Sequence, residues 1–298
     1  MASPHGYRIF GLNVLSEWEI PYWPAGGPPW EVRVERGEVP AELPGAEVLW
    51  DGAFHGMRGR CLLHYPEVGR ILIEHGERVT VAPAAGAFSA PIAHVLGGTG
   101  FAMVLYQRGM LCLHASAVAW QGRAYLVMGP SGAGKSTTVS ALLAHGGEFI
   151  SDDVTAIAPG PAGGFFATPS FPSVRLLADS HGELAGRIGA RGALDPVDEK
   201  IRLHYTGTVA VQPQPIARIC FLESDETIAR PRAEPILGQE SVGALQRSLY
   251  RRRPGRIVAD PARLAEMTIA LALRVEVLRL TRPRHGFALE ELCALVLG

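Results

Sequence analysis

The stretch GPSGAGKST, residues 129–137, contains residue types that bind phosphate at the spacing this chemistry needs. Four of its residues fit the pattern G-x-x-x-x-G-K-[ST]: Gly129, Gly134, Lys135 and Ser136. Glycine allows φ > 0 and close backbone approach, so backbone N–H groups and the positive end of a following helix can surround phosphate oxygens. Lys135 would reach the β- and γ-phosphates and Ser136 would bind Mg²⁺. The nucleotide-binding residues predicted by this pattern are Gly129, Pro130, Ser131, Gly132, Ala133, Gly134, Lys135, Ser136 and Thr137.

The flanks of this stretch have the composition that a phosphate loop requires. RAYLVMG before it is typical of a strand, and KSTTVSALLAHG after it is typical of a helix ended by glycine. The alternative is a glycine-rich turn that binds nothing, and it would require strand, glycines, lysine and hydroxyl to coincide by chance.

A histidine is predicted to lie beside this loop. LHASAVAWQGRAYLVMG reads as a hairpin of two apolar runs joined by Gln121-Gly122. If Trp120 pairs with Arg123, antiparallel register places His114 opposite Gly129, and cross-strand neighbours lie ~5 Å apart. His114 could then contact a phosphate or orient an acid; the alternative is a histidine satisfied at a strand end.

Two adjacent acids follow the next predicted strand. GEFISDDVTAI runs into Asp152 and Asp153 after one helix and a tight turn, so we expect this strand to return beside the strand that precedes the loop. The acids would lie at the carboxyl end of a strand, where parallel α/β sheets bind ligands. One carboxylate can hold Mg²⁺ and the other can accept a proton from an attacking hydroxyl. The alternative is a solvated Asp-Asp turn.

Composition narrows the class of protein. The chain has 298 residues, 47% hydrophobic and 19% charged, with a formal net charge of -1, which is typical of one large or two ordinary globular domains and indicates no nucleic-acid partner. The four cysteines are scattered without metal-ligand spacing, and no secretion signal or membrane span is evident, so we expect a cytoplasmic protein.

The character of the sequence changes near residue 90. Before it, 7–14, 46–50, 60–65, 70–75 and 78–83 are typical of short strands separated by Pro/Gly turns. After it come a helical segment around 100–108 and then alternating strands and helices. We expect a small β-rich domain over 1–90 and a catalytic domain over 91–298.

The segments LHASAV, GPSGAGKST and ISDD at their mutual spacings resemble the catalytic core of the HPr kinase/phosphorylase family, which is distantly similar to phosphoenolpyruvate carboxykinases. The resemblance is specific over 112–158 and continues weakly beyond it. The opening YRIFGLNVLSEWEIP resembles HPr-kinase-like proteins that accompany lasso-peptide biosynthesis. The resemblance implies that Asp152 acts as base on a serine hydroxyl, Asp153 supports Mg²⁺ and His114 assists as a neighbouring charge.

The chain also departs from this family. The bifunctional members have a glutamate two residues before an Arg-Gly pair, whereas PSVRLL has Ser173 at the glutamate position and Leu176 after Arg175. This departure argues against a phosphorylase reaction and against part of the family's metal site. Arg175 could clamp phosphate or lie on the surface.

Two further segments are informative. YRRRPGR, residues 250–256, could dock an acidic peptide or form a solvated basic loop. Asp260-Pro261 begins a predicted capped helix. The second half of the chain offers further cations that could approach the phosphates: Lys200, Arg202 and Arg282.

The sequence thus predicts an α/β phosphate-loop kinase domain of HPr kinase/phosphoenolpyruvate carboxykinase type with a mixed sheet, preceded by a small β-rich domain. The expected activity is Mg²⁺-dependent transfer of the ATP γ-phosphate to a serine or threonine hydroxyl of a peptide or protein, such as an HPr-like protein or a ribosomal peptide precursor. A small-molecule kinase and a non-catalytic nucleotide-binding regulator are the alternatives. We expect neither a membrane nor a nucleic-acid partner, and a homo-oligomer is left open.

Overall fold

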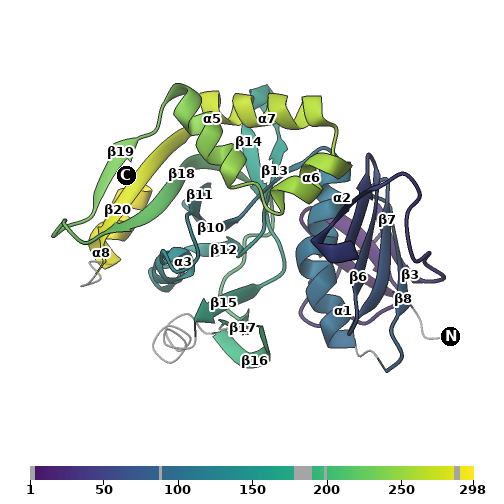
Figure 1. Ribbon diagram of the computed structural model, residues 1–298. Helices are drawn as coiled ribbons and strands as arrows, with labels where there is room; N and C mark the ends of the chain where they lie inside the picture. Colours follow the sequence, from purple (N-terminus) through teal and green to yellow (C-terminus); the bar gives the residue numbers. More distant parts are fainter. Residues whose placement is uncertain (1–3, 87–88, 178–189, 198–199, 285–288) are drawn as a thin grey trace. The chain divides into compact units, whose positions relative to one another are not determined.

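The computed structural model describes residues 4–86, 89–177, 190–197, 200–284 and 289–298, and its contacts divide the chain into two compact units (Figure 1). The first unit comprises Met1–Cys112 and Leu249–Met267, and the second comprises Leu113–Ser248 and Thr268–Gly298. These bounds differ from the division at residue 90 drawn from composition. Helix α2 (Phe101–Gln107) packs on strand β7 of the first unit, and α6 (Arg252–Val258) returns there from late in the sequence to contact α2 and β5. Composition does not report which sheet a helix packs against.

The first unit is built on one mixed sheet. Its strands run in the order β1-β2-β3-β8-β7-β6-β5-β4, with β3 parallel to both β2 and β8 and the other neighbours antiparallel. Burial alternates along β2 and β3, whereas β6, β7 and β8 each bury three consecutive residues, so both faces of the sheet are covered there. The strands are β1 (His5–Ile9), β2 (Leu12–Ser16), β3 (Val32–Arg36), β4 (Glu47–Leu49), β5 (Phe54–Met57), β6 (Arg60–Tyr65), β7 (Gly69–Glu74) and β8 (Arg78–Pro83).

The first predicted strand, 7–14, is two strands. Phe10 and Gly11 have φ of 50° and 76°, so they form a tight turn between β1 and β2, where the sequence alone suggested a continuous apolar run. β3 was missed although Val32 and Val34 alternate with charged residues, and β5 was missed because a glycine interrupts it.

Helices complete the first unit. The expected helical segment around 100–108 is part of a longer one, because α1 (Ser89–Val95) continues through the π-helix η2 (Leu96–Gly100) into α2. The segment 250–256 contributes to α6 and is not a loop. Helix α7 (Pro261–Arg274) belongs to the first unit only up to Met267. It begins as predicted, since Asp260 Oδ1 accepts hydrogen bonds from the backbone N–H groups of Ala262 and Arg263. The unit also contains the one-turn 3₁₀ helix η1 (Trp50–Gly52).

The second unit is a mixed α/β structure. Its main sheet has the strand order β12-β10-β11-β18-β14-β13, with β20 paired to β18 and β19 paired to β20, and a separate sheet has the order β15-β17-β16. The division of the chain between the two units falls within β9 (Leu111–Leu113), after Cys112. The strands are β10 (Ala115–Trp120), β11 (Arg123–Met128), β12 (Glu148–Ser151), β13 (Thr155–Pro159), β14 (Phe165–Thr168), β15 (Ser173–Leu177), β16 (Ala190–Val197), β17 (Lys200–Tyr205), β18 (Gln214–Asp225), β19 (Arg232–Pro235) and β20 (Glu276–Pro283).

Helices α3 (Lys135–Ala144) and α8 (Leu289–Leu297) contact each other and share a core with the main sheet. Leu142 of α3 and Val296 of α8 are buried in that core, together with Val127 of β11 and Leu222 of β18. This packing holds the N-terminus of α3 at the end of β11. The unit also contains η3 (Pro161–Gly163) and α5 (Gly238–Arg247).

Within the described ranges, no helix combines the length and the apolar composition needed to cross a bilayer.

Candidate functional site

The predicted phosphate loop connects β11 to α3. Gly129, Gly132 and Gly134 have φ of 146°, 79° and 101°, which L side chains rarely adopt, so the glycines meet a real conformational need. At Gly129 the chain passes so close to β18 that an added Cβ would lie 2.2 Å from the backbone O of Leu222. The strand, glycine loop and helix therefore follow one another as the sequence indicated.

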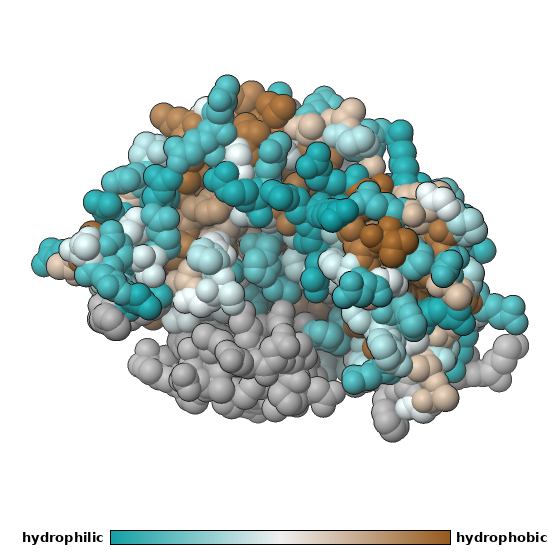
Figure 2. Space-filling view, in the orientation of Figure 1, coloured by the Kyte–Doolittle hydropathy of each residue, from teal (hydrophilic) through white to brown (hydrophobic). Residues whose placement is uncertain are grey.

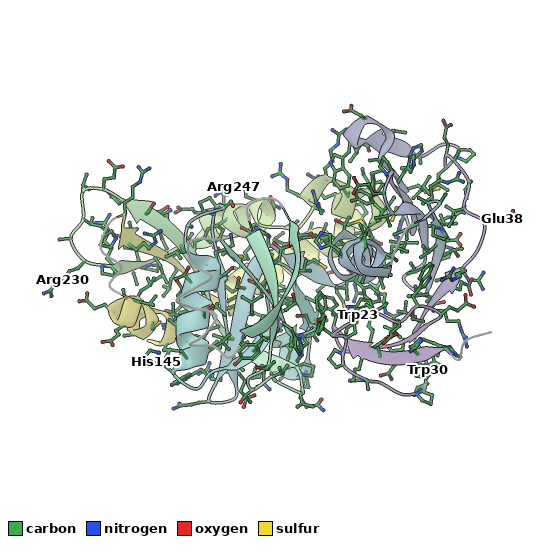
Figure 3. The ribbon with its side chains drawn as sticks, turned by 90° about the horizontal axis from the view of Figure 1, so that it is seen from below. Trp23, Trp30, Glu38, His145, Arg230 and Arg247 are labelled. Carbon is green, nitrogen blue, oxygen red and sulfur yellow. The ribbon has the colours of Figure 1, made fainter. Side chains whose placement is uncertain are left out.

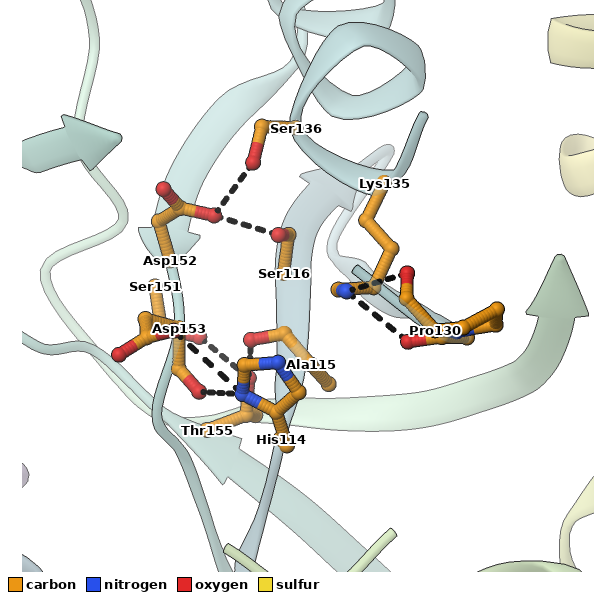
Figure 4. Close-up of polar contacts among 11 residues, drawn as sticks. His114, Ala115, Ser116, Pro130, Lys135, Ser136, Ser151, Asp152, Asp153 and Thr155 are labelled. Atoms are coloured by element: carbon orange, nitrogen blue, oxygen red, sulfur yellow. Dashed lines mark hydrogen bonds and ion pairs between the residues drawn. The ribbon is translucent and has the colours of Figure 1, made fainter. Parts of the chain in front are cut away.

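Two cationic side chains contact the backbone of this loop. The buried Lys135 Nζ donates hydrogen bonds to the backbone O atoms of Gly129 (2.9 Å) and Pro130 (3.2 Å), as Figure 4 shows. The Nε of Arg282, a buried residue of β20, donates to the backbone O of Ala133 at 2.8 Å. Arg282 therefore supports the loop from the far end of the sequence, a role that sequence analysis could not assign.

The hairpin that precedes the loop has the predicted register. Trp120 pairs with Arg123, and the ladder continues to Ala115 opposite Met128. Gln121 and Gly122 have φ of 49° and 74°, as a two-residue hairpin turn requires. His114 comes directly before this ladder and lies at the end of the sheet where the loop begins.

The strand that carries the acids has a different neighbour from the one expected. β12 pairs with β10 and not with β11, because the hairpin strand β10 lies between them. β10 is antiparallel to both, so β11 and β12 point the same way and their carboxyl ends reach the same edge of the sheet. Asp152 and Asp153 therefore still reach the phosphate loop.

Asp152 lies between two hydroxyl groups. Its Oδ1 accepts a hydrogen bond from Ser116 Oγ at 2.5 Å and from Ser136 Oγ at 3.3 Å (Figure 4). Ser116 is buried on β10 and was not among the predicted site residues. Side chains two apart on a strand share a face, so the spacing of His114 and Ser116 was the available signal.

Asp153 lies against His114. His114 Nδ1 is 3.1 Å from the backbone O of Asp153 and 3.4 Å from its Oδ1. Both oxygens are acceptors for a neutral ring, so Nδ1 carries the hydrogen and Nε2 carries the lone pair. Burial lowers the pKa of His114 below its ordinary value of 6.5, although the charge of Asp153 opposes the shift. Asp153 has φ of 71°, a strained conformation of the kind that clusters at functional sites.

The structure thus brings together His114, Lys135, Ser136, Asp152 and Asp153 with the loop residues. Arg175 lies in β15, and Lys200 and Arg202 lie in β17. Their side chains lie outside the described part of the chain, so their predicted contacts with phosphate stay predictions. Ser173 is buried at the first position of β15.

The hydroxyl and carboxylate oxygens at this edge fit a Mg²⁺ ion. Mg²⁺ prefers oxygen ligands and is commonly held by one or two protein oxygens together with substrate phosphates. The 3.3 Å contact between Ser136 Oγ and Asp152 Oδ1 places two such oxygens beside the phosphate loop.

Comparisons with known proteins bear on this part of the chain. The family model described as SynChlorMet cassette protein ScmC matches residues 100–186, which contain the loop and both acids. The thiamine import ATP-binding protein ThiQ of Ruegeria sp. (strain TM1040) is 30% identical over 184 residues, covering 59% of this chain and 71% of that protein. At this identity and coverage, the chain belongs to the family of that import protein.

Among solved structures, the Hpr(Ser) kinase/phosphatase from Coxiella burnetii aligns with 62% of this chain and 88% of its own, at 14% identity and a TM-score of 0.34. This TM-score is too low to show that the two chains share a fold.

Proposed function

We propose that this chain is a kinase that uses ATP and Mg²⁺ to phosphorylate a serine or threonine hydroxyl of a peptide or protein. The observation that carries the proposal is the pair of acids after β12, one against the loop serine and the other against a histidine. The relationship to an ATP-binding protein supports ATP as the phosphate donor. The match to a cassette protein is compatible with the lasso-peptide branch that the N-terminal sequence resembles.

The contacts favour a different division of roles from the one that the family resemblance implied. Asp152 touches the hydroxyl of Ser136, which the loop pattern assigns to Mg²⁺, so we place Asp152 on the cation side. Asp153 accepts from His114 and orients its ring. The proton acceptor is then His114, through Nε2.

The chemistry follows from these positions. His114 has a lowered pKa and is neutral near pH 7, so it can take the proton of the acceptor hydroxyl. The carboxylate of Asp153 stabilises the imidazolium that forms. Lys135 and the loop N–H groups bind and orient the triphosphate, which is most of what phosphoryl transfer asks of a protein. Mg²⁺, held by Ser136 and Asp152, would neutralise charge on the phosphates.

A Mg²⁺ titration of transfer from labelled ATP tests these roles, with serine peptides, HPr, shikimate and gluconate offered as acceptors. We expect Asp152→Asn to need more Mg²⁺ and to recover at high Mg²⁺, because it loses an anionic ligand. His114→Gln should keep ATP binding and lose about 10²- to 10⁴-fold in turnover at all Mg²⁺ concentrations. If excess Mg²⁺ fails to rescue Asp152→Asn and His114→Gln retains full turnover, Asp152 is the base and our assignment is reversed.

A second candidate is ATP hydrolysis without a hydroxyl acceptor, which the relationship to an import ATP-binding protein favours. Phosphate release measured with and without the peptides distinguishes the two. A kinase should transfer label to one acceptor class, whereas release that no acceptor changes would indicate a hydrolase. Transfer to shikimate or gluconate alone would indicate a small-molecule kinase, and binding without any phosphate movement would indicate a regulator.

A further inference from the structure

A hollow lies on the first unit, beside the end of β4. It has a volume of about 360 Å³ and is lined by Val48, Leu49, Trp50, Asp51, Gly52 and Arg253. Two of its apolar side chains remain in solvent, since Val48 is 51% and Trp50 38% exposed. Figure 2 shows exposed hydrophobic residues clustered just below the position of α6 in Figure 1. The volume is at the lower end for ligand pockets and suits one or two side chains.

Trp50, the aromatic residue that lines this hollow, lies in strained backbone and its ring contacts two neighbouring side chains. Trp50 and Asp51 have φ of 57° and 52°, and a left-handed conformation costs a non-glycine residue about 1–2 kcal/mol. The ring of Trp50 is fixed on one side by Phe54, at 5.5 Å between ring centroids. The Arg251 guanidinium lies 5.0 Å from its centroid, within cation–π range. An exposed, braced tryptophan in strained backbone indicates a binding role.

The segment 250–256 brings positive charge to this hollow, because Arg253 lines it and the Arg251 guanidinium lies over Trp50. Arg251, Arg252, Arg253 and Arg256 are all exposed. Arg253 donates from Nε (3.1 Å) and Nη2 (2.8 Å) to Glu47 Oε1. Within the described ranges, the other three have no carboxylate within ion-pair distance, so the local charge is positive in a chain of net charge -1.

We propose that this hollow docks an acidic segment of the peptide or protein substrate. One apolar or aromatic side chain of the segment enters beside Trp50, while Asp or Glu residues on either side of it pair with Arg251, Arg252 and Arg256. This identification of the partner rests on the proposed function, because a kinase for peptides must recruit them, but the docking itself requires no nucleotide. The combination of an apolar hollow with arginines favours a peptide, whose side chains can satisfy both.

The binding test uses a fluorescein-labelled twelve-residue peptide of Glu and Asp with one central Phe, measured by anisotropy against the full-length chain. We expect Arg252→Glu to weaken binding about tenfold or more, because it reverses a charge at the site. Trp50→Ala should weaken it similarly, as should a peptide with Ser in place of Phe. Arg230→Glu is the matched control, because Arg230 is an exposed arginine on the β18–β19 loop of the second unit (Figure 3). Raising the salt concentration should also weaken binding.

Several results would overturn the proposal. Arg252 is exposed, so Arg252→Glu should fold normally. If this variant binds the peptide as well as wild type, the arginines are not part of the docking site. Equal binding of a Lys-rich peptide would remove the charge preference. Binding to phosphatidylglycerol vesicles without binding to the peptide would assign the surface to a membrane instead. If the peptide binds as expected but no acceptor is phosphorylated, the docking site stands and the kinase proposal fails; ATP-induced thermal stabilisation, measured in parallel, should be the same in Arg252→Glu as in wild type.

Discussion

Ser116→Ala tests the contact on which the cation side of the site depends. The variant removes the donor that lies 2.5 Å from Asp152 Oδ1 and keeps the contact of Ser136 Oγ with that oxygen. A hydrogen bond to a charged group is worth about 1.5–3 kcal/mol net. If this whole free energy is lost in the transition state, where Asp152 must be correctly oriented, the rate of phosphoryl transfer should fall about 10- to 150-fold. Ser116 would act by positioning Asp152 and not by contacting the phosphates.

The assay is phosphoryl transfer across a Mg²⁺ titration, with thermal unfolding measured on the same samples. We expect Ser116→Ala to need more Mg²⁺ for half-maximal rate and to recover part of its activity at high Mg²⁺. Ser140→Ala is the matched control, because Ser140 is a buried serine of α3 whose hydroxyl has no hydrogen-bond partner in the described part of the chain. That control should keep its activity and its Mg²⁺ dependence.

Two outcomes would refute the reasoning. A Ser116→Ala variant with normal rate and normal Mg²⁺ dependence would show that the contact does not matter. A variant that loses activity in proportion to thermal stability, with an unchanged Mg²⁺ dependence, would show that Ser116 only supports the fold.

Three further predictions concern the loop and the core. Lys135→Ala should lose the thermal stabilisation by Mg-ATP that we expect of wild type, because Lys135 is the loop cation proposed to contact the phosphates. Equal stabilisation of variant and wild type would show that the loop does not bind nucleotide. Gly129→Ala should destabilise the chain by about 2 kcal/mol or more, because its Cβ would meet the backbone O of Leu222 at 2.2 Å. Gly132→Ala, whose Cβ would have nothing within 4 Å, should cost only the strain of its left-handed conformation. Denaturant unfolding of the two variants compares these costs directly. Burial raises the pKa of Cys293 to about 11 and of Cys220 to about 12, so both thiols should resist DTNB at pH 8 until urea is added. In the unfolded chain these thiols ionise near their ordinary pKa of 9.0, whereas in the folded chain they stay protonated at that pH. The free energy of unfolding should therefore decline as pH rises above about 9. Rapid DTNB labelling of the native chain would contradict the burial of these thiols.

Short-range patterns in the sequence were enough to predict the local structure around the loop. The Gln121-Gly122 turn fixed the hairpin register, and strand, glycines and helix followed in order. What the sequence did not show was which strands become neighbours. β12 was expected beside β11, and only the packed sheet shows that β10 lies between them. Likewise nothing local indicates that α6 joins the unit formed by the first 112 residues.

The candidate site was predictable to a similar extent. Residue type and spacing predicted that the loop and both acids follow strands and that His114 begins a hairpin, and the structure brings these residues together. The contacts that distinguish Asp152 from Asp153 depend on side-chain direction, which strand pairing sets. Ser116 was overlooked because a serine in an apolar strand carries no chemical signal by itself. Arg282 was named as a cation that could approach the phosphates, but its contact with Ala133 could not be predicted because 149 residues separate the two in the sequence.

The residues of the site from His114 to Asp153 lie within a continuous stretch in which every strand and helix is joined to the next by a short connection. Contacts between residues close in sequence require little loop closure and tend to form early, so this stretch can assemble before distant parts of the chain arrive. Arg282 is the exception, since β20 must be in place before it reaches Ala133. The side chains proposed to act in catalysis can therefore come together before the backbone of the proposed phosphate loop is held in place. Under that proposal, the chain would become able to bind nucleotide only once β20 has joined the sheet.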